Sequence, residues 1–273
     1  MLHPMSVRMT VLASGSRGNC TVISSGGASI LVDAGLSCRE TVKRMRASGE
    51  DPHQIRAIVI SHEHSDHVAG LQVLARRLKA PVYMSEATYQ SWRRFTRDAE
   101  GKPVNIEQRE HFRVGHSFSI GDITITPFTI PHDAADPCGF TFKASGVKIG
   151  IATDLGYLPF SVKDNLRNCD GLMIESNHDL EMLRNGPYPW MVKQRVMSRV
   201  GHLSNSALAD FLQTDYDGNA EFLVLAHLSE QNNHPELARE TAYKALGTRL
   251  SLFQSSALAL AQQDQPLQPI CIG

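Results

Sequence analysis

The stretch "SHEHSDHVAGL" (residues 61–71) places three imidazoles and two carboxylates within the six positions from His62 to His67. The apolar, β-branched run "IRAIVI" (55–60) precedes it, and apolar residues at helical spacing follow in "VAGLQVLARRLK" (68–79). The first run is typical of a buried strand and the second of an amphipathic helix. Because α/β proteins build ligand sites where a strand ends and a helix begins, the stretch predicts a ligand-bearing turn.

The residue types in this turn indicate a metal site. Imidazole nitrogens suit zinc, iron and manganese, and carboxylates can bridge two hard ions. In an extended loop His62 and His64 project to the same side, whereas Asp66 and His67 lie in the turn that starts the helix. One short segment can therefore serve two adjacent ions. A polar helix cap at Asp66 would explain one carboxylate, but not the three histidines beside it.

Three further candidate ligands also follow predicted strands. His132 ends "FTIPH", Asp154 ends "IGIATD" and His227 ends "LVLAH". Each residue alone could be an ordinary loop histidine or a turn-forming aspartate. Together they complement the histidine-rich turn and complete a set of seven metal-ligand candidates.

The remaining pattern alternates between strands and helices in two halves. Strands are predicted at 9–14, 19–24, 28–35, 55–60, 81–85, 170–176 and 220–229, and a β-rich section at 112–132, 139–145 and 147–154. Helices are predicted at 38–48, 69–79, 86–100, 190–200, 205–216 and 234–247. The tail "QQDQPLQPICIG" (262–273) is weakly specified. No linker or internal repeat divides the chain, so we expect a single hydrolase domain over residues 1–273. Two sheets packed face to face, with helices outside, would make a four-layer α/β sandwich.

Composition sets few limits on function. The 273 residues carry a formal net charge of -1, which gives no global argument for a polyanionic partner but allows a local basic groove. The basic runs "RRLK" (76–79) and "WRRFTR" (92–97) could form that groove or could be solvated helix faces. The five cysteines are scattered and suggest a reducing compartment. With no signal pattern and no apolar run approaching about 20 residues, we expect a cytoplasmic protein without a membrane partner.

Two loops could contact an anionic substrate. The loop that contains Ser16 and Asn19 can present backbone N–H groups to an anion, although a plain hairpin turn is the alternative. The segment "GHLSN" places His202, Ser204 and Asn205 directly before a helix. A helix N-terminus with a preceding histidine can be a phosphate site with a proton donor, whereas capping alone would explain the serine and the asparagine.

Two more segments complete the candidate substrate contacts. "IESNHD" follows a strand and carries Asn177 beside a glutamate and a histidine. "RNGPYPWMVKQR" (184–195) holds Tyr188 and Trp190, flanked by Arg184, Lys193 and Arg195. These aromatic and basic side chains could stack on bases and contact phosphates, or could belong to an ordinary helix that begins at a proline.

The order HxHxDH, strand-end His, strand-end Asp and late strand-end His resembles the metallo-β-lactamase superfamily. The likeness covers residues 8–250 and implies an α/β fold, the four-layer αββα sandwich of the metallo-β-lactamase type. It also implies two divalent transition-metal ions, zinc or manganese. One ion would be held by His62, His64 and His132 and the second by Asp66, His67 and His227, with Asp154 bridging them.

The segments "GSRGN", "DAGLS", "ESNHDLEMLRNGPYPW", "GHLSN" and "AHLSEQNNHPELA" are closely similar to the YycJ/WalJ branch of this superfamily. The resemblance implies a DNA-directed phosphodiesterase, a 5′-to-3′ exonuclease on double-stranded DNA. In the more distant transfer-RNA 3′-processing nucleases, a loop like "GHLSN" serves the scissile phosphate. The candidate catalytic residues are then Asp66 and His202, and the candidate substrate contacts are Ser16, Asn19, Asn177, Ser204 and Asn205.

The chain departs from other branches of the superfamily. The stretch between Asp154 and His227 is too short for the inserted domain of the β-CASP nucleases, and no cysteine stands where some β-lactamases bind the second metal. A carboxylic ester, thioester or lactone hydrolase, such as a glyoxalase II or a lactonase, remains an alternative because it shares the ligands. Such an enzyme does not need "GHLSN" or "ESNHD". A non-catalytic binding module is a third possibility, against which the intact ligand set argues.

Overall fold

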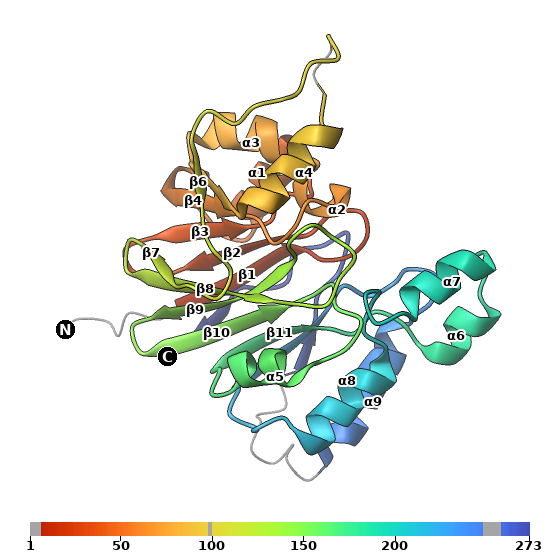
Figure 1. The fold of residues 1–273 in the computed structure, drawn as a ribbon. Coiled ribbons are helices and arrows are strands. Elements are labelled where there is room, and N and C mark those ends of the chain that lie inside the picture. Colours follow the sequence, from red (N-terminus) through yellow and green to blue (C-terminus); the bar gives the residue numbers. More distant parts are fainter. Residues whose placement is uncertain (1–6, 98–99, 248–257) are drawn as a thin grey trace.

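The computed structural model describes residues 7–97, 100–247 and 258–273, and it consists of two stacked sheets with helices on both outer faces (Figure 1). The first sheet contains β1 (Val7–Ala13), β2 (Cys20–Ser24), β3 (Ser29–Val32), β4 (Ile55–Val59), β5 (Val82–Met84), β6 (Arg109–His111) and β14 (Ile270–Ile272). The second contains β7 (Phe118–Ile120), β8 (Ile123–Thr129), β9 (Cys138–Ala144), β10 (Val147–Ala152), β11 (Gly171–Glu175), β12 (Phe222–Ala226) and β13 (Leu258–Leu260). The predicted four-layer αββα sandwich is confirmed.

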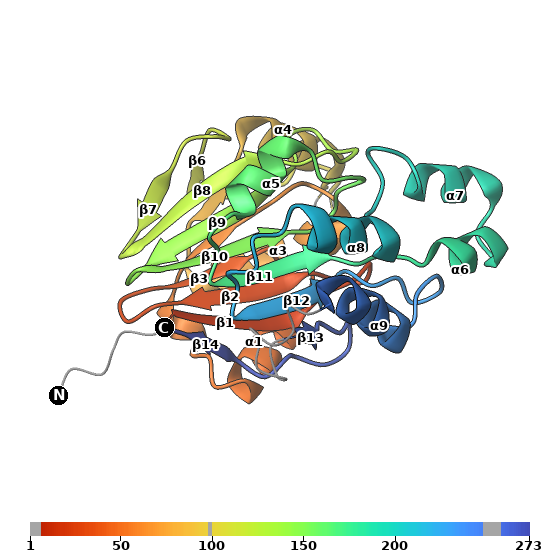
Figure 2. The ribbon, with the colours of Figure 1, turned by 90° about the horizontal axis from the view of Figure 1, so that it is seen from below.

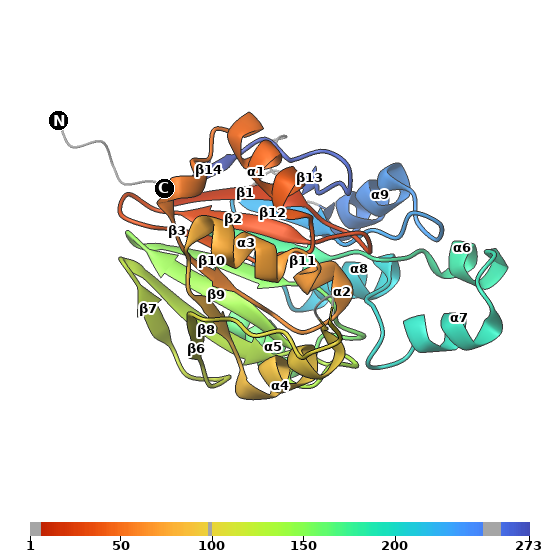
Figure 3. The same cartoon turned by 90° about the horizontal axis from the view of Figure 1, so that it is seen from above.

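Each sheet carries its own layer of helices. The first sheet is covered by α1 (Cys38–Ala47), α2 (Ser65–Val68), α3 (Leu71–Leu78) and α4 (Glu86–Phe95), with a 3-10 turn at Pro52–Gln54 (Figure 3). On the second side lie α5 (Phe160–Leu166), α8 (Asn205–Thr214) and α9 (Pro235–Leu246), as Figure 2 shows. The short helices α6 (Leu180–Asn185) and α7 (Trp190–Val196) project from the body as an arm (Figure 1).

Three apolar cores hold these layers together. Between the sheets, Ile30 and Val224 pack with Phe140 and other buried side chains of both inner faces. The neighbouring residues Leu31 and Leu225 point the opposite way, into the cores under the two helix layers. This period-2 alternation between two apolar environments explains why the central strands read as continuous hydrophobic runs.

The strand order positions the site. The sheets run β14-β1-β2-β3-β4-β5-β6 and β13-β12-β11-β10-β9-β8-β7. Strand β3 pairs in parallel with β4, and β11 pairs in parallel with both β10 and β12. Parallel neighbours end at the same edge of a sheet, so the residues that follow these strands come together at one end of the sandwich.

The tail differs from its weak sequence signal. Strand β14 pairs antiparallel with β1, with Val7 opposite Ile272 and Met9 opposite Ile270. Its isoleucines are buried between the sheets. No helix within the described ranges combines the length and the apolar character that crossing a membrane requires.

Candidate metal centre

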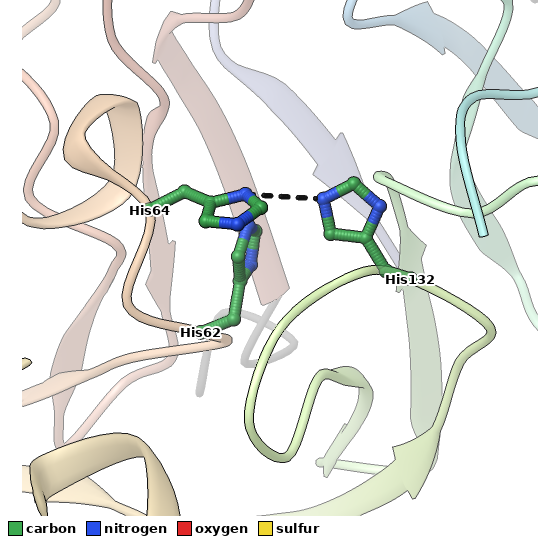
Figure 4. Close-up of side chains that lie close together, drawn as sticks. All are labelled: His62, His64 and His132. Atoms are coloured by element: carbon green, nitrogen blue, oxygen red, sulfur yellow. Dashed lines mark hydrogen bonds between the residues drawn. The ribbon is translucent and has the colours of Figure 1, made fainter. Parts of the chain in front are cut away.

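The first group of candidate ligands consists of His62, His64 and His132, whose ligand nitrogens lie within 4.8 Å of one another. Figure 4 shows the three rings converging from the loop after β4 and the loop after β8. Nδ1 of His64 is 3.2 Å from Nε2 of His132. The outer nitrogens are held by the protein, because Nε2 of His64 lies 3.2 Å from the carbonyl of Asp133 and Nδ1 of His132 lies 3.2 Å from that of Gly201.

The second group consists of Asp66, His67, Asp154 and His227, again with ligand atoms within 4.8 Å of one another. One carboxylate oxygen of Asp66 is 3.5 Å from Nε2 of His67 and 3.4 Å from Nε2 of His227. Oδ2 of Asp154 is 3.3 Å from Nε2 of His67. The structure thus assembles the seven predicted metal-ligand candidates into two adjacent groups, and the metal roles of the individual residues stay a prediction.

Asp33 orients His67 and was missed by the sequence reasoning. Its carboxylate accepts a hydrogen bond from Nδ1 of His67 at 2.8 Å and from the backbone N–H and hydroxyl of Ser61. Carboxylates that fix the ring of a metal-binding histidine in this way select its tautomer. The signal was present in "DAGLS", because Asp33 follows β3 just as Asp154 follows β10.

Glu175, the glutamate of "IESNHD", was noted at a strand end but given no role by the sequence reasoning. It is fully buried, and its Oε1 accepts hydrogen bonds from Nδ1 of His202 at 2.9 Å and from Nδ1 of His227 at 2.8 Å. Its Oε2 accepts the backbone N–H groups of Leu155 at 3.0 Å and Leu203 at 2.9 Å. One carboxylate therefore ties a candidate metal ligand, the candidate proton donor and two loops together.

Three of the residues at these strand ends have a left-handed backbone conformation. Asp33, Asp154 and His227 have φ angles of 60°, 61° and 55°, in the left-handed region that residues other than glycine seldom occupy. Such positions cost on the order of 1–3 kcal/mol each and persist where the surroundings over-determine them. Gly35 is needed nearby for another reason, because a Cβ there would lie 1.7 Å from the carbonyl oxygen of Asp66.

The ionisation of the candidate ligands favours cation binding at His62 and Asp154 and opposes it at His67. Burial, reinforced by His67, holds the pKa of His62 well below its ordinary value, so the ring is neutral. Burial alone would raise the pKa of Asp154, but His227 and His67 outweigh it and hold that pKa well below its usual range. Burial opposes protonation of His67, yet the carboxylates of Asp154, Asp33 and Asp66 raise its pKa well above its usual value. Metal binding must therefore displace a proton from His67.

The residues fit divalent metal ions. Nε2 of His62 and Oδ2 of Asp154 are buried polar atoms that form no hydrogen bond in the described part of the chain, although Oδ2 of Asp154 lies 3.3 Å from Nε2 of His67. Leaving two such atoms unpaired is costly unless a ligand satisfies them. The donors are imidazole nitrogens and carboxylate oxygens, which suit zinc or manganese.

A cavity of about 320 Å³ opens over both groups. It is lined by Ser16, His64, Ser65, Asp66, Asp154, Arg195, His202 and His227. Arg195 is the one Lys or Arg side chain in this lining, and its Nε donates to Asp133 Oδ2 at 2.6 Å. The ring of His202 lies 5.3 Å from that of His132 and 5.2 Å from that of His227, so it sits beside both groups.

The predicted substrate contacts are placed less uniformly. Ser16 lines the cavity, whereas Asn19 is buried and its Nδ2 lies 3.2 Å from Asp66 and 3.0 Å from Nε2 of His67. Asn177 is buried and donates to the carbonyl of His227 at 2.7 Å. These two amides support the candidate ligands, and their contact with substrate stays a prediction.

Ser204 and Asn205 have local partners. The hydroxyl of Ser204 caps α8 by accepting the N–H of Ala207 at 3.1 Å. The side chain of Asn205 is buried and exchanges hydrogen bonds with Ser176 and Asn233. Neither residue lines the cavity over the metal groups, and their contact with substrate stays a prediction.

The candidate stacking and phosphate-binding residues of the arm have different surroundings. Helix α7 begins directly after Pro189, and Trp190 is 64% exposed at its start. Lys193 is buried and donates to the carbonyl of Arg184 at 2.7 Å, so its ammonium group holds α6 against α7. Arg195, two residues after Lys193, lines the cavity.

Comparison with known proteins identifies the family. Residues 28–228 match the model of the β-lactamase superfamily domain. The exodeoxyribonuclease YycJ of Bacillus anthracis is 36% identical over 242 residues, which cover 89% of this chain and 90% of that protein. The exodeoxyribonuclease WalJ of Streptococcus pneumoniae serotype 2 is 37% identical over 245 residues, with 90% of each chain covered. The chain belongs to the metallo-β-lactamase superfamily and, within it, to the YycJ/WalJ branch.

Solved structures agree on the fold. The metallo-β-lactamase fold protein YhfI from Bacillus subtilis superimposes with a TM-score of 0.69 at 18% identity, covering 96% of this chain and 99% of that one. The short form of human tRNase Z gives a TM-score of 0.62 at 18% identity, covering 96% and 100%. At this level of identity the likeness concerns the architecture alone.

Proposed function

We propose that this member of the metallo-β-lactamase superfamily is a metal-dependent phosphodiesterase acting on nucleic acid, and that it removes nucleotides from duplex DNA in the 5′-to-3′ direction. The observation that supports it most is the Glu175–His202 pair beside the two ligand groups, where Nδ1 of His202 lies 2.9 Å from the carboxylate. An ester hydrolase with the same metal ligands does not need this pair. The identity of 36–37% to two exodeoxyribonucleases over 89–90% of the chain points the same way.

Two divalent transition-metal ions would be held by the two groups. His62, His64 and His132 would hold the first, and Asp66, His67 and His227 the second, with Asp154 between them. When bound, such a pair lowers the pKa of water and stabilises the attacking and leaving oxygens of a displacement at phosphorus. Asp33 and Glu175 orient two of these ligands, because they accept hydrogen bonds from Nδ1 of His67 and Nδ1 of His227, respectively.

His202 would protonate the departing 3′ oxygen. Glu175 accepts the hydrogen bond from its Nδ1, so Nε2 is the nitrogen left to carry a proton toward the cavity. Burial alone lowers the pKa of His202, but Glu175 outweighs that effect and raises it, which favours the protonated ring. A positioned general acid contributes roughly 10²- to 10⁴-fold to a rate.

Arg195 and Ser16 would bind phosphate oxygens from opposite elements of the cavity. Arg195 comes from the arm and Ser16 from the loop between β1 and β2, and both side chains are exposed. A guanidinium group matches the geometry of a phosphate and remains charged at all working pH values. Its carboxylate partner Asp133 keeps the side chain beside the cavity before substrate arrives.

To test this, the metal-loaded protein is incubated with end-labelled duplex DNA, single-stranded DNA and RNA. In parallel it is incubated with a thioester, a lactone and a lactam. We expect stepwise shortening of duplex DNA from the 5′ end and little turnover of the carbonyl substrates. Rapid thioester or lactone hydrolysis with intact DNA would overturn the proposal. Cleavage of RNA in preference to DNA would retain the phosphodiesterase and reject the proposed substrate.

A further inference from the structure

A second cavity adjoins the metal centre on the side of the first helix layer. It measures about 550 Å³ and lies between the α2–α3 segment and α4, which lie on the outer face of the first sheet (Figure 3). His64 and Ser65 line both this cavity and the one over the metal groups. The two cavities therefore adjoin, with a candidate metal ligand at their boundary.

Its walls carry apolar side chains that the fold leaves exposed. Val73 of α3 is 58% exposed and Phe95 at the end of α4 is 76% exposed, and both line the cavity. Trp92 lies between them in the lining and is buried, at 3% exposure. Large apolar groups gathered around one depression are typical of a binding site, because folding alone would favour covering them.

The cavity lining is acidic, whereas a basic side chain lies beside it. The lining contains the carboxylates of Glu63 and Asp133 and no Lys or Arg. Arg94 of α4 is exposed and stands outside the lining, next to the lining residue Phe95. The guanidinium carbon of Arg94 lies 5.7 Å from the centroid of the Phe95 ring. A phosphate would be repelled from the interior and attracted to the guanidinium group of Arg94 beside Phe95.

We propose that this cavity is a nucleobase subsite. It would take a base of the strand whose phosphodiester lies at the metal centre, with the base against Phe95 and Val73 and a flanking phosphate beside Arg94. Aromatic side chains combined with basic ones are the usual means of holding a nucleic-acid strand without sequence preference. The inference rests on the proposed function and extends it to a second site.

The test removes the aromatic ring and the base in turn. Stacking on an aromatic side chain is worth about 1–3 kcal/mol per base, so Phe95→Ala should lower kcat/KM on duplex DNA roughly 5- to 150-fold. Phe95→Trp should restore it. On the same DNA with an abasic residue at the terminal or penultimate position, the loss should shrink toward unity at one of these positions.

Phe160→Ala is the matched control. Phe160 is 73% exposed at the start of α5 and has Arg167 6.0 Å from its ring, but it lines neither cavity. It should leave both activity and binding unchanged. Fluorescence anisotropy with a labelled single-stranded oligonucleotide in EDTA should show weaker binding to Phe95→Ala alone, which tests the subsite without turnover.

Different results reject different claims. Equal losses on intact and abasic DNA, or none on either, would overturn the subsite while leaving the nuclease in place. Wild-type protein that binds the oligonucleotide but cleaves no DNA with metal would instead reject the proposed function. If Phe95→Ala abolished self-association in sedimentation and left DNA binding intact, this face would belong to a second copy of the chain, and the subsite would be wrong.

Discussion

Replacing Glu175 with glutamine tests how the metal centre is organised. One carboxylate oxygen accepts hydrogen bonds from the two ring nitrogens, and the other accepts hydrogen bonds from the two backbone N–H groups, at 2.8–3.0 Å. A glutamine amide has only one acceptor oxygen. If that oxygen faces the rings, the N–H groups of Leu155 and Leu203 lose their acceptor. At about 1–3 kcal/mol for each unsatisfied buried donor, the fold loses about 2–6 kcal/mol.

The opposite orientation of the glutamine amide would weaken metal binding instead. If the amide NH₂ faces the rings, it pairs only with a histidine that has no proton on Nδ1. The proton of His227 then sits on Nε2, the nitrogen that faces Asp66. A ligand in the wrong tautomer cannot bind a cation, and loss of such an orienting partner costs roughly 10- to 100-fold in metal affinity or activity. Glu175→Gln is therefore expected to lower the affinity for the second ion, the rate, or both, along with stability.

The assay compares Glu175→Gln with Glu50→Gln. Glu50 is also buried, at 4% exposure, and its carboxylate accepts hydrogen bonds from Arg8, Thr10 and Ser24, away from both cavities. Urea unfolding of the metal-free proteins, metal titration and DNA cleavage are measured for each. Both variants should lose stability, but only Glu175→Gln should lose metal affinity and rate. Wild-type metal affinity and turnover in Glu175→Gln would refute the reasoning.

Three further changes probe the site. His202→Ala should keep both metals and the fold but lose roughly 10²- to 10⁴-fold in DNA cleavage, and less on a nitrophenyl phosphodiester whose leaving group needs no proton; equal cleavage by mutant and wild type would remove it from the mechanism. Asp154→Ala should abolish hydrolysis and weaken at least one ion, measured by metal analysis, because its charge offsets the repulsion between the cations; near-normal turnover with two ions bound would contradict this. Arg195→Ala should raise KM for DNA by roughly 10- to 100-fold if its charged hydrogen bonds to phosphate are worth about 1.5–3 kcal/mol. Arg184→Ala, on the same arm with its guanidinium paired to Glu181, is the control, and equal KM values would reject Arg195 as a phosphate ligand.

The local pattern of the chain was enough to find the ligand candidates. His62, His64, Asp66 and His67 follow β4 within one strand–turn–helix segment, so their proximity is a consequence of chain connectivity. The strand-end rule extended the set to Asp154 and His227, because parallel strands finish at the same edge. The succession of strands and helices in two halves likewise predicted two sheets with helices outside.

Contacts between distant segments were decided only by the tertiary structure. Weak local signals such as "PICIG" became β14 because Ile270 and Ile272 pair with β1 at the other end of the chain. Lys193 was a candidate phosphate ligand until the packing of α6 on α7 directed its ammonium group to a backbone carbonyl.

The orienting carboxylates Asp33 and Glu175 show most clearly which features the sequence determines and which the tertiary structure decides. The sequence by itself determined which side chains could bind metal, because ligand chemistry depends on residue type and local spacing. Only the tertiary structure decided that Asp33 accepts a hydrogen bond from Nδ1 of His67 and that Glu175 accepts hydrogen bonds from Nδ1 of His202 and Nδ1 of His227. A hydrogen bond acts over about 3 Å, and no local pattern specifies which two strand ends the sheet order will bring that close.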